Sequence, residues 1–121
     1  MNVITSEEPT RKQLERSLSK QLQELYLERL AHKTDKVSCQ LLNGNLTIVI
    51  EGSLTQPEQF LLKEQDQTQT VTRVRSGLDE IMRPEVINLI EKTLNRKVVD
   101  FMSNTTLSTS RTGALVILSD R

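Results

Sequence analysis

The sequence predicts an α+β fold in which two long helices cover one face of a four-stranded antiparallel sheet, as a two-layer sandwich. Three observations support this prediction: a helical stripe of apolar residues at 71–94, an alternating pattern at 36–51, and a similar succession of segments in each half of the chain. Each half reads as a helix followed by a hairpin. The predicted architecture is therefore an αββ unit that occurs twice.

The longest predicted helix covers residues 71–94, where apolar side chains recur at steps of three and four and so share one face. They are Val71, Val74, Leu78, Ile81, Met82, Val86, Leu89, Ile90 and Leu94. Arg75 and Asp79 lie on the polar face as an i,i+4 pair. Pro84 predicts a kink in a single helix, or two helices meeting end to end, and the stripe that continues in phase on both sides of Pro84 favours the single helix. At about 36 Å the helix exceeds the ~27 Å diameter of a compact chain, so we expect it to overhang toward a partner.

The first half of the chain predicts a helix at 11–32 and a hairpin at 36–51. Thr10 is a suitable N-cap for the helix, and a leucine stripe follows it. In the hairpin, apolar and polar residues alternate on both sides of Asn43 and Gly44. These two residue types tolerate positive φ, so they indicate a tight turn between two strands.

The second half begins with a short helix that Thr55 can cap, and residues 63–70 form either a linker or the start of the long helix. Strands are predicted at 97–102, with Val99 and Phe101 on one face, and at 113–118. The polar segment 103–112 is predicted to be the connecting loop. By alternation, the sheet face away from the helices is expected to carry Leu42, Val49, Val116 and Leu118, which a second copy of the chain would cover.

The 121 residues fit one domain. Residues 1–9 have no periodicity and are predicted to be a flexible N-terminal tail, so the domain itself is expected at 10–121. No apolar run is long enough for a signal peptide or a membrane span, which predicts a cytoplasmic protein without direct membrane insertion.

The charge and composition argue against several function classes. Sixteen basic and sixteen acidic side chains balance, so no net field favours nucleic acid, and nucleic-acid binding is disfavoured. A single histidine and a single cysteine, His32 and Cys39, are too few for a zinc site or a disulfide. No phosphate-binding glycine loop and no nucleophile–base arrangement occurs. We therefore predict no metal, no cofactor and no enzymatic activity.

The polar segment 103–112 allows two interpretations. It can be a flexible surface loop, or it can be a small anion or ligand site built from hydroxyls, backbone amides and a guanidinium. The candidate ligand-binding residues are Ser103, Asn104, Thr105, Thr106 and Arg111.

Three segments together resemble one bacterial family. Residues 54–61 resemble its LTxxExxL turn and helix, residues 74–91 its central helix, and residues 96–104 its RxVxxxxSD strand. The family, MpsC-like, was a domain of unknown function before it was named for the C component of a sodium-translocating, membrane-potential-generating system. The matching motif positions are Thr55, Glu58, Arg75, Pro84, Arg96 and Asp100. The sequence departs from the pattern at Asn95, where the family usually has glycine, and at Asn104, where it usually has aspartate.

The resemblance implies an association with membrane uptake of cations or inorganic carbon. On this basis we expect a non-enzymatic, homodimeric accessory or regulatory protein that reaches the membrane through a transport protein. The alternative is a regulatory module, unrelated to transport, that binds a small ligand or nucleic acid.

Overall fold

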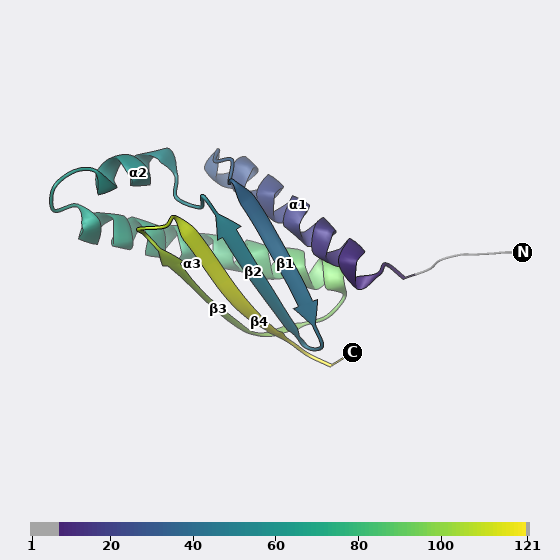
Figure 1. Cartoon of the computed structure of the whole chain (residues 1–121). Helices are drawn as coiled ribbons and strands as arrows, with labels where there is room; N and C mark the ends of the chain where they lie inside the picture. Colours follow the sequence, from purple (N-terminus) through teal and green to yellow (C-terminus); the bar gives the residue numbers. More distant parts are fainter. Residues whose placement is uncertain (1–7, 121) are drawn as a thin grey trace, which may run out of the picture.

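Four antiparallel strands form one sheet, and three helices accompany it (Figure 1). The computed structural model describes residues 8–120. In chain order the elements are α1 (Arg11–Leu30), β1 (Lys36–Leu42), β2 (Asn45–Glu51), α2 (Gln56–Leu62), α3 (Thr68–Leu94), β3 (Val98–Thr106) and β4 (Arg111–Leu118). The strand order β1-β2-β4-β3 places β2 and β4 in the centre. The predicted α+β class and four-stranded antiparallel sheet are confirmed, whereas most of the predicted tail at 1–9 lies outside the described residues.

Local signals fix both ends of α1 and the first hairpin. The Thr10 hydroxyl accepts from the Gln13 amide at 3.1 Å, and the Gln13 side chain accepts from the Thr10 amide at 2.8 Å, which completes a capping box. The helix ends at Leu30 because Ala31 adopts a left-handed φ of 50°, so the predicted end at residue 32 is two residues too late. Asn43, with φ of 57°, turns the predicted hairpin.

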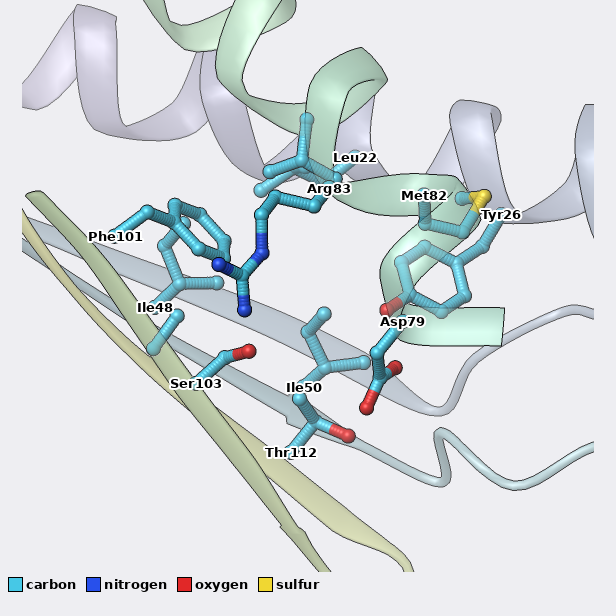
Figure 2. A pocket seen from close by; sticks show the side chains of 12 residues that line it. Leu22, Tyr26, Ile48, Ile50, Asp79, Met82, Arg83, Phe101, Ser103 and Thr112 are labelled. Atoms are coloured by element: carbon cyan, nitrogen blue, oxygen red, sulfur yellow. The ribbon is translucent and has the colours of Figure 1, made fainter. Parts of the chain in front are cut away.

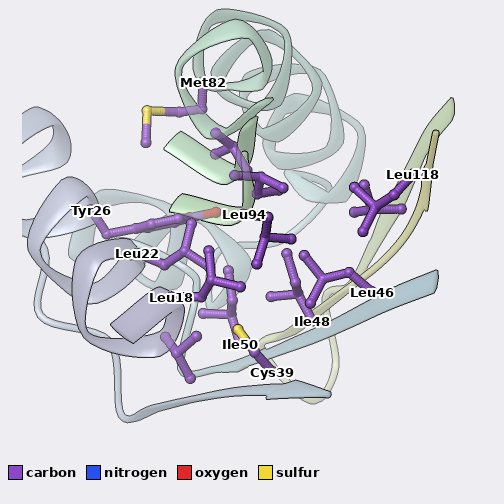
Figure 3. Close-up of a cluster of buried hydrophobic side chains, with 14 residues drawn as sticks. Leu18, Leu22, Tyr26, Cys39, Leu46, Ile48, Ile50, Met82, Leu94 and Leu118 are labelled. Carbon is purple, nitrogen blue, oxygen red and sulfur yellow. The ribbon is translucent and has the colours of Figure 1, made fainter. Parts of the chain in front are cut away.

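The hydrophobic core lies between one face of the sheet and helices α1 and α3 (Figure 3). Alternate residues of β1, β2 and β4 face the helices, as the strand period of two requires. The buried core residues are Leu18, Leu22, Tyr26, Val37, Cys39, Leu46, Ile48, Ile50, Met82, Val86, Ile90, Leu94, Val116 and Leu118. The two longest helices and the sheet therefore share one core.

Helix α3 confirms one part of its prediction and corrects another. It is one helix of 27 residues that continues through Pro84, so the alternative of two helices is wrong. Val74 and Ile81 are exposed, because they lie beside the buried stripe and not within it. The first turns of α3 do extend past the core, but α2 of the same chain packs against them, where Leu54 and Val71 are buried. Helix α2 of the same chain therefore covers part of the overhang, and contact of this region with a partner stays a prediction.

The prediction of a loop at 103–112 is wrong, because most of these residues belong to strands β3 and β4. β3 continues to Thr106 and β4 begins at Arg111, so only residues 107–110 connect them. Threonine is well suited to strands, and the hydroxyls of Thr105 and Thr112 hydrogen-bond across the pair at 2.6 Å. A polar composition alone does not distinguish such a strand from a loop.

The pairing register of the strands also shows that two predictions about which sheet face a residue lies on are wrong. A bulge between Val98 and Asp100 leaves Val99 exposed, so Val99 and Phe101 do not share a face. Val116 and Leu118 are buried in the core. Residues 114–118 are all apolar, so the sequence does not show which of them face the helices. In the structure, Leu115 and Ile117 lie on the face away from the helices.

Candidate functional site

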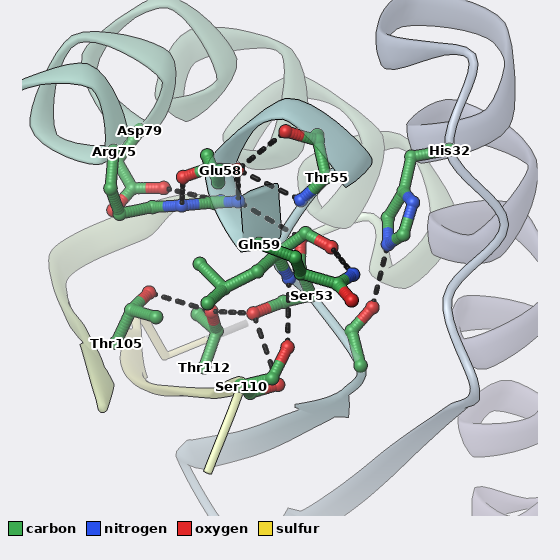
Figure 4. Close-up of polar contacts among 12 residues, drawn as sticks. His32, Ser53, Thr55, Glu58, Gln59, Arg75, Asp79, Thr105, Ser110 and Thr112 are labelled. Carbon is green, nitrogen blue, oxygen red and sulfur yellow. Dashed lines mark hydrogen bonds and ion pairs between the residues drawn. The ribbon is translucent and has the colours of Figure 1, made fainter. Parts of the chain in front are cut away.

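A buried ion pair joins the short helix α2 to α3 (Figure 4). Glu58 is 1% exposed and Arg75 is 4% exposed. Arg75 donates from Nε to Glu58 Oε2 at 2.9 Å and from Nη2 to Glu58 Oε1 at 2.6 Å, so the pair is bidentate. Nη2 also donates to the Ser53 carbonyl at 2.9 Å, and the Thr55 amide and hydroxyl each donate to Glu58 Oε1 at 2.9 Å.

This environment sets the charge of both groups. Burial alone would raise the pKa of Glu58, but the hydrogen bonds from Arg75 and Thr55 outweigh it, and the pKa lies below its usual value. Burial alone would lower the pKa of Arg75, but the contacts of Arg75 with Glu58 hold its pKa above the usual value. Both side chains are therefore charged at neutral pH.

A chain of hydroxyl groups connects the ion pair to the β3–β4 hairpin (Figure 4). Thr112 donates from its hydroxyl to Ser53 Oγ at 2.8 Å. The hydroxyl of Thr105 is in turn hydrogen-bonded to that of Thr112 at 2.6 Å. The Leu54 amide donates to Ser110 Oγ at 3.0 Å. The segment between β2 and α2 is thus fixed to both the ion pair and the hairpin.

Next to this network, a pocket opens between α3 and the sheet (Figure 2). Its volume is ≈ 30 Å³, which exceeds the ~10–15 Å³ that a cavity needs to hold one water molecule. Polar groups reach it from four elements: Tyr26 from α1, Asp79 from α3, Ser103 from β3 and Thr112 from β4. The rest of the lining is mostly apolar, including Ile48, Ile50, Met82 and Phe101.

The acidic groups of the pocket are shifted toward their neutral forms. Burial raises the pKa of Asp79, although Arg75, which donates from Nη1 to Asp79 Oδ1 at 3.3 Å, acts to lower it. Burial also raises the pKa of Tyr26. The Asp79 side chain is 26% exposed, and in its ionised form it only accepts hydrogen bonds, as it does from Arg75.

Arg83 forms the cationic part of the pocket wall. Its guanidinium lies over the Phe101 ring at 5.6 Å from the ring centroid, one helical turn after Asp79. The pocket therefore presents a carboxyl and a guanidinium above an apolar floor. In a space of this size, the arrangement can hold a water molecule or a small ion.

The structure separates the candidate ligand-binding residues predicted from the sequence. Ser103 lines the pocket and Thr105 belongs to the hydroxyl chain. Asn104, Thr106 and Arg111 alternate with them and are exposed on the other face of the sheet. Arg111 pairs there with Glu51 at 3.7 Å. These residues therefore do not form one site.

Sequence reasoning missed Tyr26 and Arg83 as pocket residues, and it assigned Arg75 and Asp79 to a solvated helix face. One signal was present: Arg75, Asp79 and Arg83 follow one another at steps of four along the edge of the apolar stripe. Such a row lies at the boundary between core and solvent.

A family model described as Na+-translocating membrane potential-generating system (MpsC) matches residues 10–120. The chain belongs to the MpsC family. Neither a curated protein nor a solved structure matches it. The predicted family resemblance is thereby confirmed.

The MpsC motif positions do not all gather in one place. Thr55, Glu58 and Arg75 meet in the buried ion-pair network. Arg96 lies at the opposite end of α3 and donates from Nε to the Ser119 carbonyl at 2.9 Å. Pro84 and Asp100 are exposed. Half of the motif positions therefore fix α2 against α3.

The departure from the MpsC pattern at Asn95 has a structural explanation. Asn95 ends α3 with a left-handed φ of 54°. Glycine and asparagine are the residue types that adopt this conformation most readily at the end of a helix. Asparagine therefore meets the same backbone requirement as the family's usual glycine. Asn104, the second departure, is exposed in β3.

Neither of the two soft metal ligands occupies a metal-binding setting. His32 donates from Nε2 to the Gly52 carbonyl at 2.7 Å, beyond the end of α1. Cys39 is buried in the core, where burial raises the pKa of its thiol. Within residues 8–120, no three acidic, histidine or cysteine side chains gather as a metal cluster. In the same residues, none of the helices has the length and apolar character needed to cross a bilayer.

Proposed function

We propose that the chain is a soluble, non-enzymatic accessory or regulatory protein of a membrane system that transports ions or inorganic carbon. It is cytoplasmic, acts as a homodimer, and lies at the membrane through a protein partner. The observation that carries this proposal is the family match over residues 10–120, since the family is described by a Na+-translocating system.

The hydrogen bonding of the motif residues supports a role without catalysis. Glu58 Oε1 accepts from Thr55 and Arg75, and Glu58 Oε2 accepts from Arg75 Nε. A carboxylate held in this way is not available as a general base, because its pKa is lowered and its lone pairs are occupied. The motif charges instead stabilise the position of α2.

Recovery of the partner tests the proposal. The tagged protein is purified from its native cells after mild detergent extraction, and the proteins recovered with it are identified. A polytopic transport protein in near-stoichiometric amount is the expected result. Phe60→Asp on α2 and Ile81→Asp on α3, both at exposed apolar positions, then locate the docking surface. Recovery of the protein alone would contradict a transport role.

The pocket favours a second candidate function, the binding of a small regulatory ligand. Asp79, Arg83 and Ser103 all line it. Thermal denaturation with Na+, K+ and small oxyanions would reveal a ligand by a raised melting temperature. Asp79→Asn and Arg83→Gln should then remove the increase, whereas Arg111→Ala, on the other sheet face, should retain it. If no compound raises the melting temperature, this candidate is wrong.

A further inference from the structure

Helix α2 and the residues on either side of it form an arm at one end of the molecule. Gly52 has a left-handed φ of 67° and Asp66 one of 64°, and the residues between them, 53–65, are here called the α2 arm. Among the helices and strands of the described chain, α2 packs against α3 alone, alongside its first turns (Figure 1). The arm therefore leaves the sheet at Gly52 and joins the long helix after Asp66.

The apolar side chains buried under the arm are separate from the hydrophobic core. Leu54 of the arm and Val71 of α3 are both fully buried, yet neither belongs to the cluster that the sheet, α1 and α3 share. Leu61 and Leu62 of α2 are only partly buried. A region with few buried apolar contacts opens at a lower free-energy cost than the core of the same protein. Apolar packing alone therefore holds the arm weakly.

The buried ion pair supplies the main attachment of the arm. The two hydrogen bonds described above join Glu58 of the arm to Arg75 of α3 (Figure 4). A bidentate pair of this kind fixes both the distance and the orientation of its partners. Removing one partner leaves the charge of the other buried, which is strongly unfavourable. The attachment of the arm therefore depends on a single pair of side chains.

Glu58 also connects the folding of α2 to its attachment. Its Oε1 atom accepts from the amide and the hydroxyl of Thr55, the N-cap of α2, and from Arg75 Nη2. A helix of seven residues is too short to be stable by itself in water. Loss of the contact between Glu58 and Arg75 therefore weakens the first turn of α2 together with its attachment, and the arm opens as a unit.

Arg75 connects the arm to the pocket. It donates from Nη1 to Asp79 Oδ1 at 3.3 Å, and Asp79 lines the pocket between α3 and the sheet. When the arm opens, Asp79 is the carboxylate that remains beside Arg75. Opening also removes the cover from Val71. It therefore changes the charge balance beside the pocket and exposes an apolar side chain at the start of α3.

We propose that the α2 arm opens as a unit while α1, α3 and the sheet stay folded, and that the Glu58–Arg75 pair holds it closed. The closed arm covers Val71 and Arg75, and the open arm exposes this apolar and this cationic side chain together. The proposal concerns the conformation of the chain alone, so it depends neither on the transport role nor on the dimer.

Thiol labelling under native conditions compares the region beneath the arm with the core. Val71→Cys places a thiol beneath the arm, and Val86→Cys is the matched variant in the core on the same helix. Native Cys39, also in the core, is an internal reference in both. The thiol at position 71 is expected to react at least ~10-fold faster than the thiol at position 86, because local opening suffices to expose it. Mass spectrometry of tryptic peptides separates the sites.

The urea dependence of labelling distinguishes local opening from global unfolding. Low concentrations of urea should accelerate the reaction at position 86 more steeply than at position 71, since global unfolding exposes more surface. Circular dichroism verifies that each variant is folded. Equal labelling rates and equal urea dependences at the two positions would overturn the proposal, because the arm would then open only with the core.

Glu58→Gln in the Val71→Cys background tests the role of the ion pair. It should raise the labelling rate at position 71 by about 10²-fold or more, toward the rate of an exposed thiol. In the Val86→Cys background, position 86 should remain the slower site. Glu64→Gln, at an exposed position of the arm, is the matched control and should leave the rate at position 71 unchanged. If Glu58→Gln raises that rate no more than Glu64→Gln does, the ion pair does not hold the arm closed.

Discussion

Glu58 and Arg75 neutralise each other inside the protein, and each depends on the other for its burial. Replacing Glu58 by glutamine removes the bidentate carboxylate from the buried Arg75 charge and leaves it only the longer contact with Asp79 at 3.3 Å. We expect Glu58→Gln to lower the free energy of unfolding by about 3–5 kcal/mol, the usual cost of breaking a buried pair from one side. Urea denaturation measures it, with the exposed Glu64→Gln as control. A loss as small as that of the control would show that the pair contributes little.

The lowered pKa of Glu58 predicts an acid dependence of stability. Below the unfolded-state pKa of about 4.3, the unfolded chain binds a proton that the folded chain does not. The stabilisation from ionised Glu58 is thus complete above that pH and is lost as the pH falls through the folded-state pKa. The unchanged protein should therefore lose more stability between neutral pH and acid than Glu58→Gln does, and parallel profiles from denaturant titrations would contradict this.

Substitutions at Asn95 test whether this position requires only a left-handed backbone conformation. Its φ of 54° predicts that Asn95→Gly keeps the free energy of unfolding within about 0.5 kcal/mol. Asn95→Val should cost about 1–2 kcal/mol, because a β-branched residue is strained in the left-handed region. Thermal denaturation of the two variants side by side distinguishes them, and equal stabilities would exclude this explanation of the departure from the family pattern.

At the scale of the elements, α3 offers a matched pair of isoleucines. Ile90 is fully buried, whereas Ile81 is 65% exposed on the same helix. Ile90→Ala should cost about 2–5 kcal/mol as a core truncation. Ile81→Ala should change the free energy of unfolding by no more than about 0.5 kcal/mol. Chemical denaturation measures both, and similar costs would mean that the assignment of the buried face is wrong.

Most elements could be predicted because their signals are local. The capping box at Thr10, the turn at Asn43 and the apolar steps of α3 each lie within a few residues of one another. Which residues of β4 face the core could not be predicted, because residues 114–118 are all apolar. Only the pairing of β4 with β2 decides which side is buried. The bulge at Val99 is likewise a property of the pairing.

At the scale of the molecule, Arg96 holds three chain segments together at the end of α3. It donates to the Ser119 carbonyl from Nε at 2.9 Å and to the Asn43 carbonyl from Nη1 at 3.3 Å. We expect Arg96→Ala to cost on the order of 1–2 kcal/mol, since the contacts are partly exposed. The Leu118 amide, which donates to the Gly44 carbonyl, should then exchange its hydrogen faster.

The neighbouring Lys97 provides the control for Arg96. Its side chain is 84% exposed and reaches Glu91 only at 4.0 Å. Lys97→Ala should therefore leave both the stability and the hydrogen exchange unchanged. Equal effects of the two substitutions would show that Arg96 acts only through its charge.

The candidate site was less predictable than the fold because its groups come from distant parts of the chain. Tyr26, Asp79 and Ser103 meet only after α1, α3 and β3 have packed. The sequence did place Ser103 and Arg75 among the candidate positions, the first in the polar segment 103–112 and the second through the family motif. It could not show that Arg75 faces inward, since arginine on a helix is most often solvated.

The strand order has a consequence for the biosynthesis of the protein. β2 lies in the centre of the sheet, yet its partner β4 follows α2, α3 and β3 in the chain. At the usual rates of translation, several seconds separate the synthesis of the two strands. During this interval one side of β2, beside Ile48 and Ile50, has unpaired backbone groups that can associate with other nascent chains. Cells that lack ribosome-associated chaperones should therefore yield less of this protein in folded form than of a protein whose strands pair in chain order.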